Sequence, residues 1–142
     1  LLGLKQYWTD PRLQRENWKG IITQISSLFS VEKTVVVFGF TAPFAPWEWY
    51  TVAQPLPFAT ISFPSMPVTS TELQDSMIRA LPYEHVLVFD YLRDVTDPDR
   101  SIEAWLDFSG YDGVQSIDTI NFGFIRHYQR QSRALQARLE QL

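Results

Sequence analysis

Residues 34–40 read Thr-Val-Val-Val-Phe-Gly-Phe, a run with no charged side chain and no alternation of apolar and polar positions. A strand with one face in water alternates apolar and polar residues, whereas a strand covered on both faces is apolar throughout. Coverage on both faces is typical of a sheet with helices packed on its two sides. The run therefore predicts a buried central strand in an α/β fold.

Helices and strands alternate along the rest of the chain. Strands are predicted at residues 34–40, 59–63 and 85–91, and two more, at residues 113–120 and 122–129, read as a hairpin joined around Asn121, with Gly123 as a bulge. Helices are predicted at residues 17–29, 47–54, 71–81 and 97–109, the third capped by Ser70 or Thr71. Alternation of this kind predicts right-handed βαβ units. We expect a three-layer αβα Rossmann-like sandwich with a mainly parallel sheet and an antiparallel C-terminal hairpin.

The length of 142 residues suits one soluble domain spanning residues 1–142. The first residues, Leu1-Leu2-Gly3-Leu4, are apolar and precede Tyr7-Trp8, the residue types that lie where a membrane span meets water. Residues 1–10 are therefore expected to be the stub that follows a transmembrane helix. Residues 131–142 are expected to form a polar C-terminal helix.

Composition and motifs exclude several kinds of chemistry. A net charge of -4 argues against a nucleic-acid partner, because phosphate binding needs clustered Lys and Arg. The chain has no cysteine and only two histidines, His85 and His127, so a metal site is not expected. No glycine-rich phosphate loop follows the first strand, and no nucleophile elbow is present. We expect no cofactor and no catalytic residue in this domain.

Candidate ligand-binding residues follow the predicted strands, because ligands of doubly wound sheets bind at the carboxyl ends of strands. Trp47, Glu48 and Tyr50 combine aromatic rings with a carboxylate, which suits the stacking and hydrogen bonding of a sugar. Trp49 and Val52 are expected instead to pack their helix onto the sheet. The predicted substrate-binding set is Thr41, Trp47, Glu48, Tyr50, Asp90 and Arg93.

Residues 93–100, Arg-Asp-Val-Thr-Asp-Pro-Asp-Arg, are rich in aspartate and allow two interpretations. Three aspartates within six positions could bind a cation. Such runs are more often solvated turns that also cap a helix, and we favour this interpretation.

The order of features resembles the extracytoplasmic C-terminal domain of bacterial GT-C membrane glycosyltransferases, the dolichyl-phosphate-mannose mannosyltransferase-like family. The resemblance covers nearly the whole chain, although each motif is short. The matching positions are Tyr7, Asp10-Pro11, Glu16-Asn17-Trp18-Lys19, Val35-Val36-Val37-Phe38, Trp49-Tyr50, the strand at 85–89, the helix around Leu106, residues 122–128, and Tyr128 with Arg130. Asn17 and Lys19 depart from the aspartate and arginine usual in that family, so a bidentate ion pair is not expected there.

The resemblance implies a non-catalytic domain of a multi-pass membrane glycosyltransferase on the extracytoplasmic, periplasmic side of the membrane. Its partners would be the transmembrane portion of the same polypeptide and a lipid-linked sugar or an acceptor glycan. The family's catalytic aspartate lies in a loop between early transmembrane helices, outside these residues, so the fragment is expected to be inactive by itself. The alternative is a free-standing Rossmann-like domain that binds a ligand or another protein.

Overall fold

A computed structural model describes residues 17–41, 44–52, 57–119, 123–132 and 140–141, and in these residues the fold is α/β with a five-stranded mixed sheet. The strands lie in the order β2-β1-β3-β5-β4. Their bounds are β1 Thr34–Phe38, β2 Ala59–Ser62, β3 His85–Phe89, β4 Tyr111–Thr119 and β5 Gly123–Arg130.

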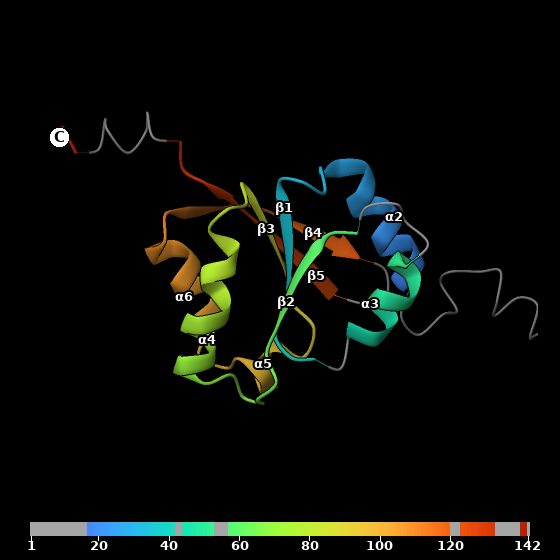
Figure 1. The fold of residues 1–142 in the computed structure, drawn as a ribbon, viewed down its shortest axis with the longest axis horizontal. Coiled ribbons are helices and arrows are strands. Elements are labelled where there is room, and N and C mark those ends of the chain that lie inside the picture. Colours follow the sequence, from blue (N-terminus) through green and yellow to red (C-terminus); the bar gives the residue numbers. More distant parts are fainter. Residues whose placement is uncertain (1–16, 42–43, 53–56, 120–122, 133–139, 142) are drawn as a thin grey trace, which may run out of the picture.

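Helices lie on both faces of the sheet, with α2 and α3 on one side and α4 and α6 on the other (Figure 1). Their bounds are α2 Trp18–Leu28, α3 Phe44–Thr51, α4 Ser70–Met77 with the 3₁₀ turn η2 Ile78–Ala80, α5 Arg93–Thr96 and α6 Ser101–Phe108. The short α5 lies at the carboxyl ends of the parallel strands (Figure 1).

The sheet is mixed, so the prediction of a mainly parallel sheet is wrong. Strand β1 pairs in parallel with β2 and β3, whereas β5 pairs antiparallel with both β3 and β4. The terminal hairpin is confirmed, and its two strands are the longest in the sheet. The reason for the correction is that β5 lies between β3 and β4 and pairs antiparallel with both, so only the two pairings of β1 are parallel.

Two hydrophobic cores lie on opposite faces of the sheet, as the uninterrupted apolar run at β1 requires. The first core joins α2 and α3 to the sheet and contains Trp18, Ile21, Ile22, Ile25, Val36, Phe38, Trp47, Phe58, Leu87, Phe89, Ile117 and Ile125. The second joins α4 and α6 to the sheet and contains Val35, Val37, Ile61, Phe63, Leu73, Met77, Ala80, Val86, Val88, Ile102, Leu106 and Tyr111. Successive residues of β1 and β3 thus point to alternate faces.

The first predicted helix is confirmed, with bounds one residue shorter at each end. The Asn17 side chain accepts a hydrogen bond from the Gly20 backbone at 3.1 Å and caps the start of α2. The buried face of α2 consists of Trp18, Ile21, Ile22 and Ile25.

Other local predictions are corrected. Helix α4 is capped by Thr69 in a capping box with Glu72, rather than by Ser70 or Thr71. The β-bulge lies at Val114, which the pairing skips, rather than at Gly123, which pairs with Thr119. The predicted C-terminal helix and the residues 1–10 fall largely or wholly outside the described residues. None of the helices in the described residues combines the length and the apolar character that crossing a membrane requires.

Candidate functional site

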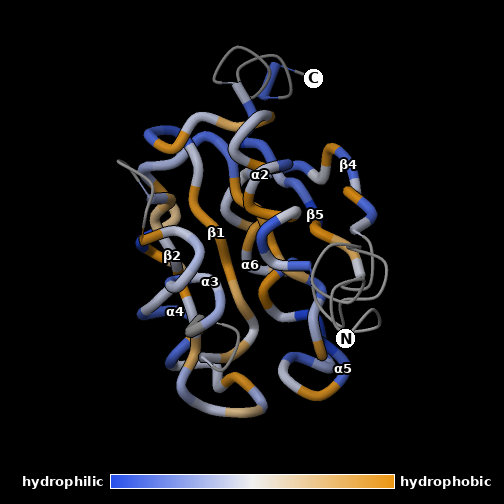
Figure 2. Tube along the Cα trace, turned by 90° about the vertical axis from the view of Figure 1, so that its right-hand side faces the viewer, coloured by the Kyte–Doolittle hydropathy of each residue, from blue (hydrophilic) through white to orange (hydrophobic). Residues whose placement is uncertain are grey.

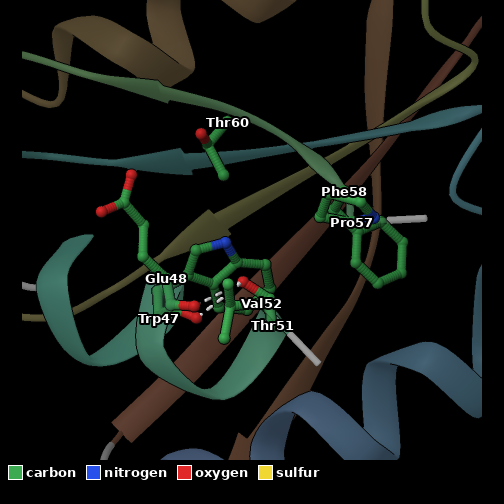
Figure 3. Close-up of a pocket in the computed structure, with 7 residues that line it drawn as sticks. All are labelled: Trp47, Glu48, Thr51, Val52, Pro57, Phe58 and Thr60. Atoms are coloured by element: carbon green, nitrogen blue, oxygen red, sulfur yellow. Dashed lines mark hydrogen bonds between the residues drawn. The ribbon is translucent and has the colours of Figure 1, made fainter. Parts of the chain in front are cut away.

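A surface pocket of about 340 Å³ lies between helix α3 and the edge strand β2. Its lining residues are Trp47, Glu48, Thr51, Val52, Pro57, Phe58 and Thr60 (Figure 3). Helix α3 is the crossover that carries the chain from β1 to the parallel strand β2. The pocket is therefore a direct product of the first βαβ unit.

Trp47 forms the wall of the pocket that is continuous with the protein core. Its exposed fraction is 1%, and its ring centroid lies 5.5 Å from that of Phe38 and 5.8 Å from that of Phe89. One helical turn later, the Thr51 hydroxyl donates a hydrogen bond to the Trp47 carbonyl at 2.8 Å. Residues four apart share a helix face, so both side chains point to the sheet.

The Thr51 hydroxyl is used by the fold, but two other polar groups of the pocket have no partner among the described residues. Among the described residues, neither the indole nitrogen of Trp47 nor the Glu48 carboxylate has a hydrogen-bonding or ion-pair partner. The indole nitrogen points to the side on which Glu48 and Thr60 lie (Figure 3). A donor, a carboxylate and a hydroxyl therefore surround a surface to which Pro57 and Phe58 contribute apolar atoms. Hydroxyl groups can donate to Glu48 and accept from Trp47.

The prediction that Trp49 and Val52 pack α3 onto the sheet is wrong, since Trp47 packs there instead. Trp49 is 76% exposed and Val52 is 81% exposed, whereas Trp47 is buried. Trp49 lies two positions from Trp47, and residues two apart point to different sides of a helix. Tyr50 and Thr41 are also exposed and do not line the pocket.

Asp90 is engaged in two ion pairs on the other side of the sheet. Its carboxylate oxygens lie 2.8 Å from Arg100 Nη1 and 3.2 Å from Arg126 Nη2. Asp90 follows Phe89, which belongs to the core under α2, so alternation turns the Asp90 side chain to the α6 face.

Arg93 is part of the fold rather than of an open site. It is 2% exposed, and its Nη2 lies 2.7 Å from Asp97 and also pairs with Glu103 of α6. A β-carbon added at Gly39 would lie 2.5 Å from the Thr96 hydroxyl oxygen and 3.2 Å from Arg93 Cδ. Side chains of α5 therefore fill the space at the carboxyl end of β1, where a ligand of a doubly wound sheet would bind.

The prediction that residues 93–100 cap a helix is confirmed. The prediction that they form a solvated turn is wrong, because Arg93, Thr96 and Asp97 are buried. Asp97 accepts hydrogen bonds from the backbone of Ser101 at 2.9 Å and of Ile102 at 3.1 Å. Burial acts to raise the pKa of Asp97, but these hydrogen bonds and the Arg93 charge outweigh burial and lower it.

The six predicted site residues do not form one cluster. Trp47 and Glu48 line the pocket on the α3 face, whereas Asp90 and Arg93 form ion pairs with groups on the α6 face. The strand pattern contained this information, because residues adjacent in a strand point to opposite faces.

A histidine pair was not predicted from the sequence. His85 Nδ1 lies 3.0 Å from His127 Nε2 across strands β3 and β5, and the ring of Phe29 lies against both. Burial and then the neighbouring His85 lower the pKa of His127. His127 also lines a smaller hollow of about 230 Å³ beside the bulge of β4. No group of three His, Asp or Glu side chains in the described ranges could hold a metal ion.

Comparison of the chain with protein-family models, with curated proteins and with solved structures finds no match.

Proposed function

We propose that this chain is a non-catalytic domain of a multi-pass membrane glycosyltransferase that uses a lipid-phosphate-sugar donor, and that the pocket between α3 and β2 holds a sugar of the donor or acceptor. The observation that supports the pocket assignment is the indole donor of Trp47 beside the Glu48 carboxylate and the Thr60 hydroxyl. The indole donor and the carboxylate have no partner in the part of the chain that the structure describes. A sugar ring offers hydroxyls to these groups and an apolar C–H face to the exposed side chains of Val52 and Pro57. The membrane assignment is supported by the sequence resemblance.

Several features belong to the same proposal. The domain lies on the extracytoplasmic side of the membrane, and the transmembrane portion of the same polypeptide supplies the catalytic aspartate. The fold is a Rossmann-like three-layer sandwich, an assignment supported by the helices on both faces of the sheet. The domain itself positions a glycan and carries no cofactor.

Two experiments test this proposal separately. The first reads the coding sequence on either side of residues 1–142, where we expect several apolar stretches of about 20 residues, since each spans one bilayer. Their absence would remove the membrane glycosyltransferase and leave a free-standing ligand-binding domain.

The second experiment measures sugar transfer by the whole protein with Glu48→Ala and Thr60→Ala together. We expect transfer to fall about tenfold or more, because each lost hydrogen bond to a sugar contributes about 1 kcal/mol. The matched control is Trp49→Ala, which changes an exposed aromatic residue on the same helix outside the pocket and should leave transfer unchanged. Normal transfer by the double variant at normal expression would contradict the pocket assignment.

A further inference from the structure

Four exposed apolar side chains gather where the parallel strands end. We name them the carboxyl-edge surface, which consists of Met66, Leu92, Val95 and Phe124. Backbone hydrogen bonds join the segments that carry these side chains. The Val68 backbone N–H donates to the Thr96 carbonyl at 2.8 Å, and the Asp90 backbone N–H donates to the Phe124 carbonyl at 2.8 Å. Figure 2 places α5, which carries Val95, at one end of the molecule.

Leu92 is held at this surface in an unfavourable conformation. Its φ is 51°, in the left-handed region that bulky residues avoid, and its side chain is 53% exposed. Asn, Asp or Gly would adopt this conformation more easily and would not expose an apolar side chain. A strained and exposed leucine that does not serve the core indicates a contact outside the described domain.

The place where the preceding chain joins the domain identifies the partner. Helix α2 begins at the same edge, because Trp18 packs on Phe38 and Phe89, the last residues of β1 and β3. Residues 1–16, which lead into α2, include apolar and interfacial residue types. These residues are Leu1, Leu2, Leu4, Tyr7 and Trp8.

Acidic side chains beside the surface outnumber basic ones. Asp99 and Asp118 are exposed, Asp118 lies directly across from Phe124, and Asp90 and Asp94 pair with two arginines. Arg100 lies 2.8 Å from both Asp90 and Asp94, and Arg126 lies 3.2 Å from Asp90. A rim without an excess of basic charge does not attract nucleic acid or anionic lipid. An apolar surface with such a rim, adjacent to a sequence with interfacial residues, matches the headgroup region of a zwitterionic bilayer.

We infer that the carboxyl-edge surface rests on a lipid bilayer, with Leu92 and Val95 inserted among the lipid headgroups. This inference goes beyond the proposed function, since a domain that holds a glycan need not contact lipid. Binding would be driven by apolar burial, so it would occur on zwitterionic lipid and would depend weakly on salt.

The first test measures sedimentation of the 142-residue chain with phosphatidylcholine vesicles. We expect Leu92→Asn with Val95→Asn to lower the partition coefficient about tenfold, because two aliphatic side chains leave the interface. Asn tolerates the left-handed conformation, so this variant should retain its melting temperature. The matched control, Ile78→Asn with Leu81→Asn, removes two exposed aliphatic side chains near the opposite end of the sheet and should bind as the unaltered chain does.

The second test uses the absence of cysteine from the sequence to place a single environment-sensitive fluorophore. Val95→Cys and Ile78→Cys label two positions that are each 58% exposed. Vesicles should shift the emission of the Val95 label to shorter wavelength and leave the Ile78 label unchanged. Equal responses at both labels, no binding to phosphatidylcholine, or binding only to anionic vesicles at low salt would each overturn the inference. None of these outcomes bears on sugar binding in the pocket.

Discussion

The indole ring of Trp18 stacks on the ring of Phe89, with centroids 6.1 Å apart and planes 14° from parallel. This contact fixes the start of α2 against the end of β3, and the Trp18 side chain is buried. Trp18→Ala is therefore expected to lower the free energy of unfolding by about 3–5 kcal/mol, since it leaves a cavity between helix and sheet. Denaturant unfolding followed by circular dichroism measures this change.

The control for that experiment is Trp49→Ala, which removes the same kind of side chain from an exposed position. It should change the free energy of unfolding by less than about 0.5 kcal/mol. Similar losses in the two variants would mean that Trp18 is not a core residue.

The buried cluster of Arg93, Asp97 and Glu103 leads to a second prediction. Arg93→Met removes the cation and leaves two carboxylates facing each other, so stability should fall by about 3–5 kcal/mol. Arg79→Met, at an exposed site, serves as the control. Adding Asp97→Asn and Glu103→Gln to Arg93→Met should recover part of the loss, because the unpaired charges are then gone. A triple variant less stable than Arg93→Met would show that charge is not the cause.

From the histidine pair we expect stability to decrease as the pH falls below 6.5. The pKa of His127 is lower in the folded state than the unfolded value of 6.5, so the unfolded chain takes up the proton first. The stability that neutral His127 contributes is therefore fully present above pH 6.5 and is lost as pH falls below that value. The slope is at most about 1.4 kcal/mol per pH unit for one group.

Free energies of unfolding measured at several pH values test this dependence. His127→Leu should flatten the slope between pH 6.5 and pH 5, whatever its effect at pH 8. Carboxylates titrate mostly below this window, so they do not obscure the result. An unchanged slope in His127→Leu would assign the pH dependence to other groups.

The 142-residue chain by itself is predicted to have no glycosyl-transfer or hydrolase activity. In the described part of the chain no hydroxyl group is hydrogen-bonded to a histidine, and the sequence holds no phosphate loop. Incubation with lipid-linked and nucleotide sugars should give no turnover above buffer. Robust turnover that one point substitution in this chain abolishes would contradict a non-catalytic role.

Much of the fold followed from the sequence because apolar patterns report burial directly. The run at β1 predicted coverage on both faces, and the helix predicted at residues 17–29 is present as α2. Helix α5 was not predicted, because a helix of four residues is too short to show apolar periodicity. It also follows Leu92, whose backbone is left-handed, and leucine is not a residue from which a left-handed conformation is expected. The mixed character of the sheet was not predicted, because the pairing of β5 with β3 joins segments far apart in the sequence, and the local sequence pattern does not encode it.

The candidate site was predicted only in part. Trp47 and Glu48 do line one pocket, but the helix phase of α3 was wrong by two residues, which exchanged the roles of Trp47 and Trp49. Asp90 and Trp47 were predicted to lie in one site, but they lie on opposite faces of the sheet. A position near the end of a strand does not specify the face of the sheet to which a side chain points. Alternation from Phe89 to Asp90 specifies it, and this pattern could have separated the two sets.

The indole N–H signal of Trp47 in a ¹H–¹⁵N spectrum tests the central claim most directly. Titration with mono- and disaccharides should shift this signal in a saturable manner, and Glu48→Ala should weaken the apparent affinity about fivefold or more, because one hydrogen bond to a charged group is lost. The signal of the exposed Trp49 should stay in place and serves as an internal control. A Trp47 signal that does not move at saturating sugar, or that moves equally in Glu48→Ala, would contradict a glycan-binding pocket between α3 and β2.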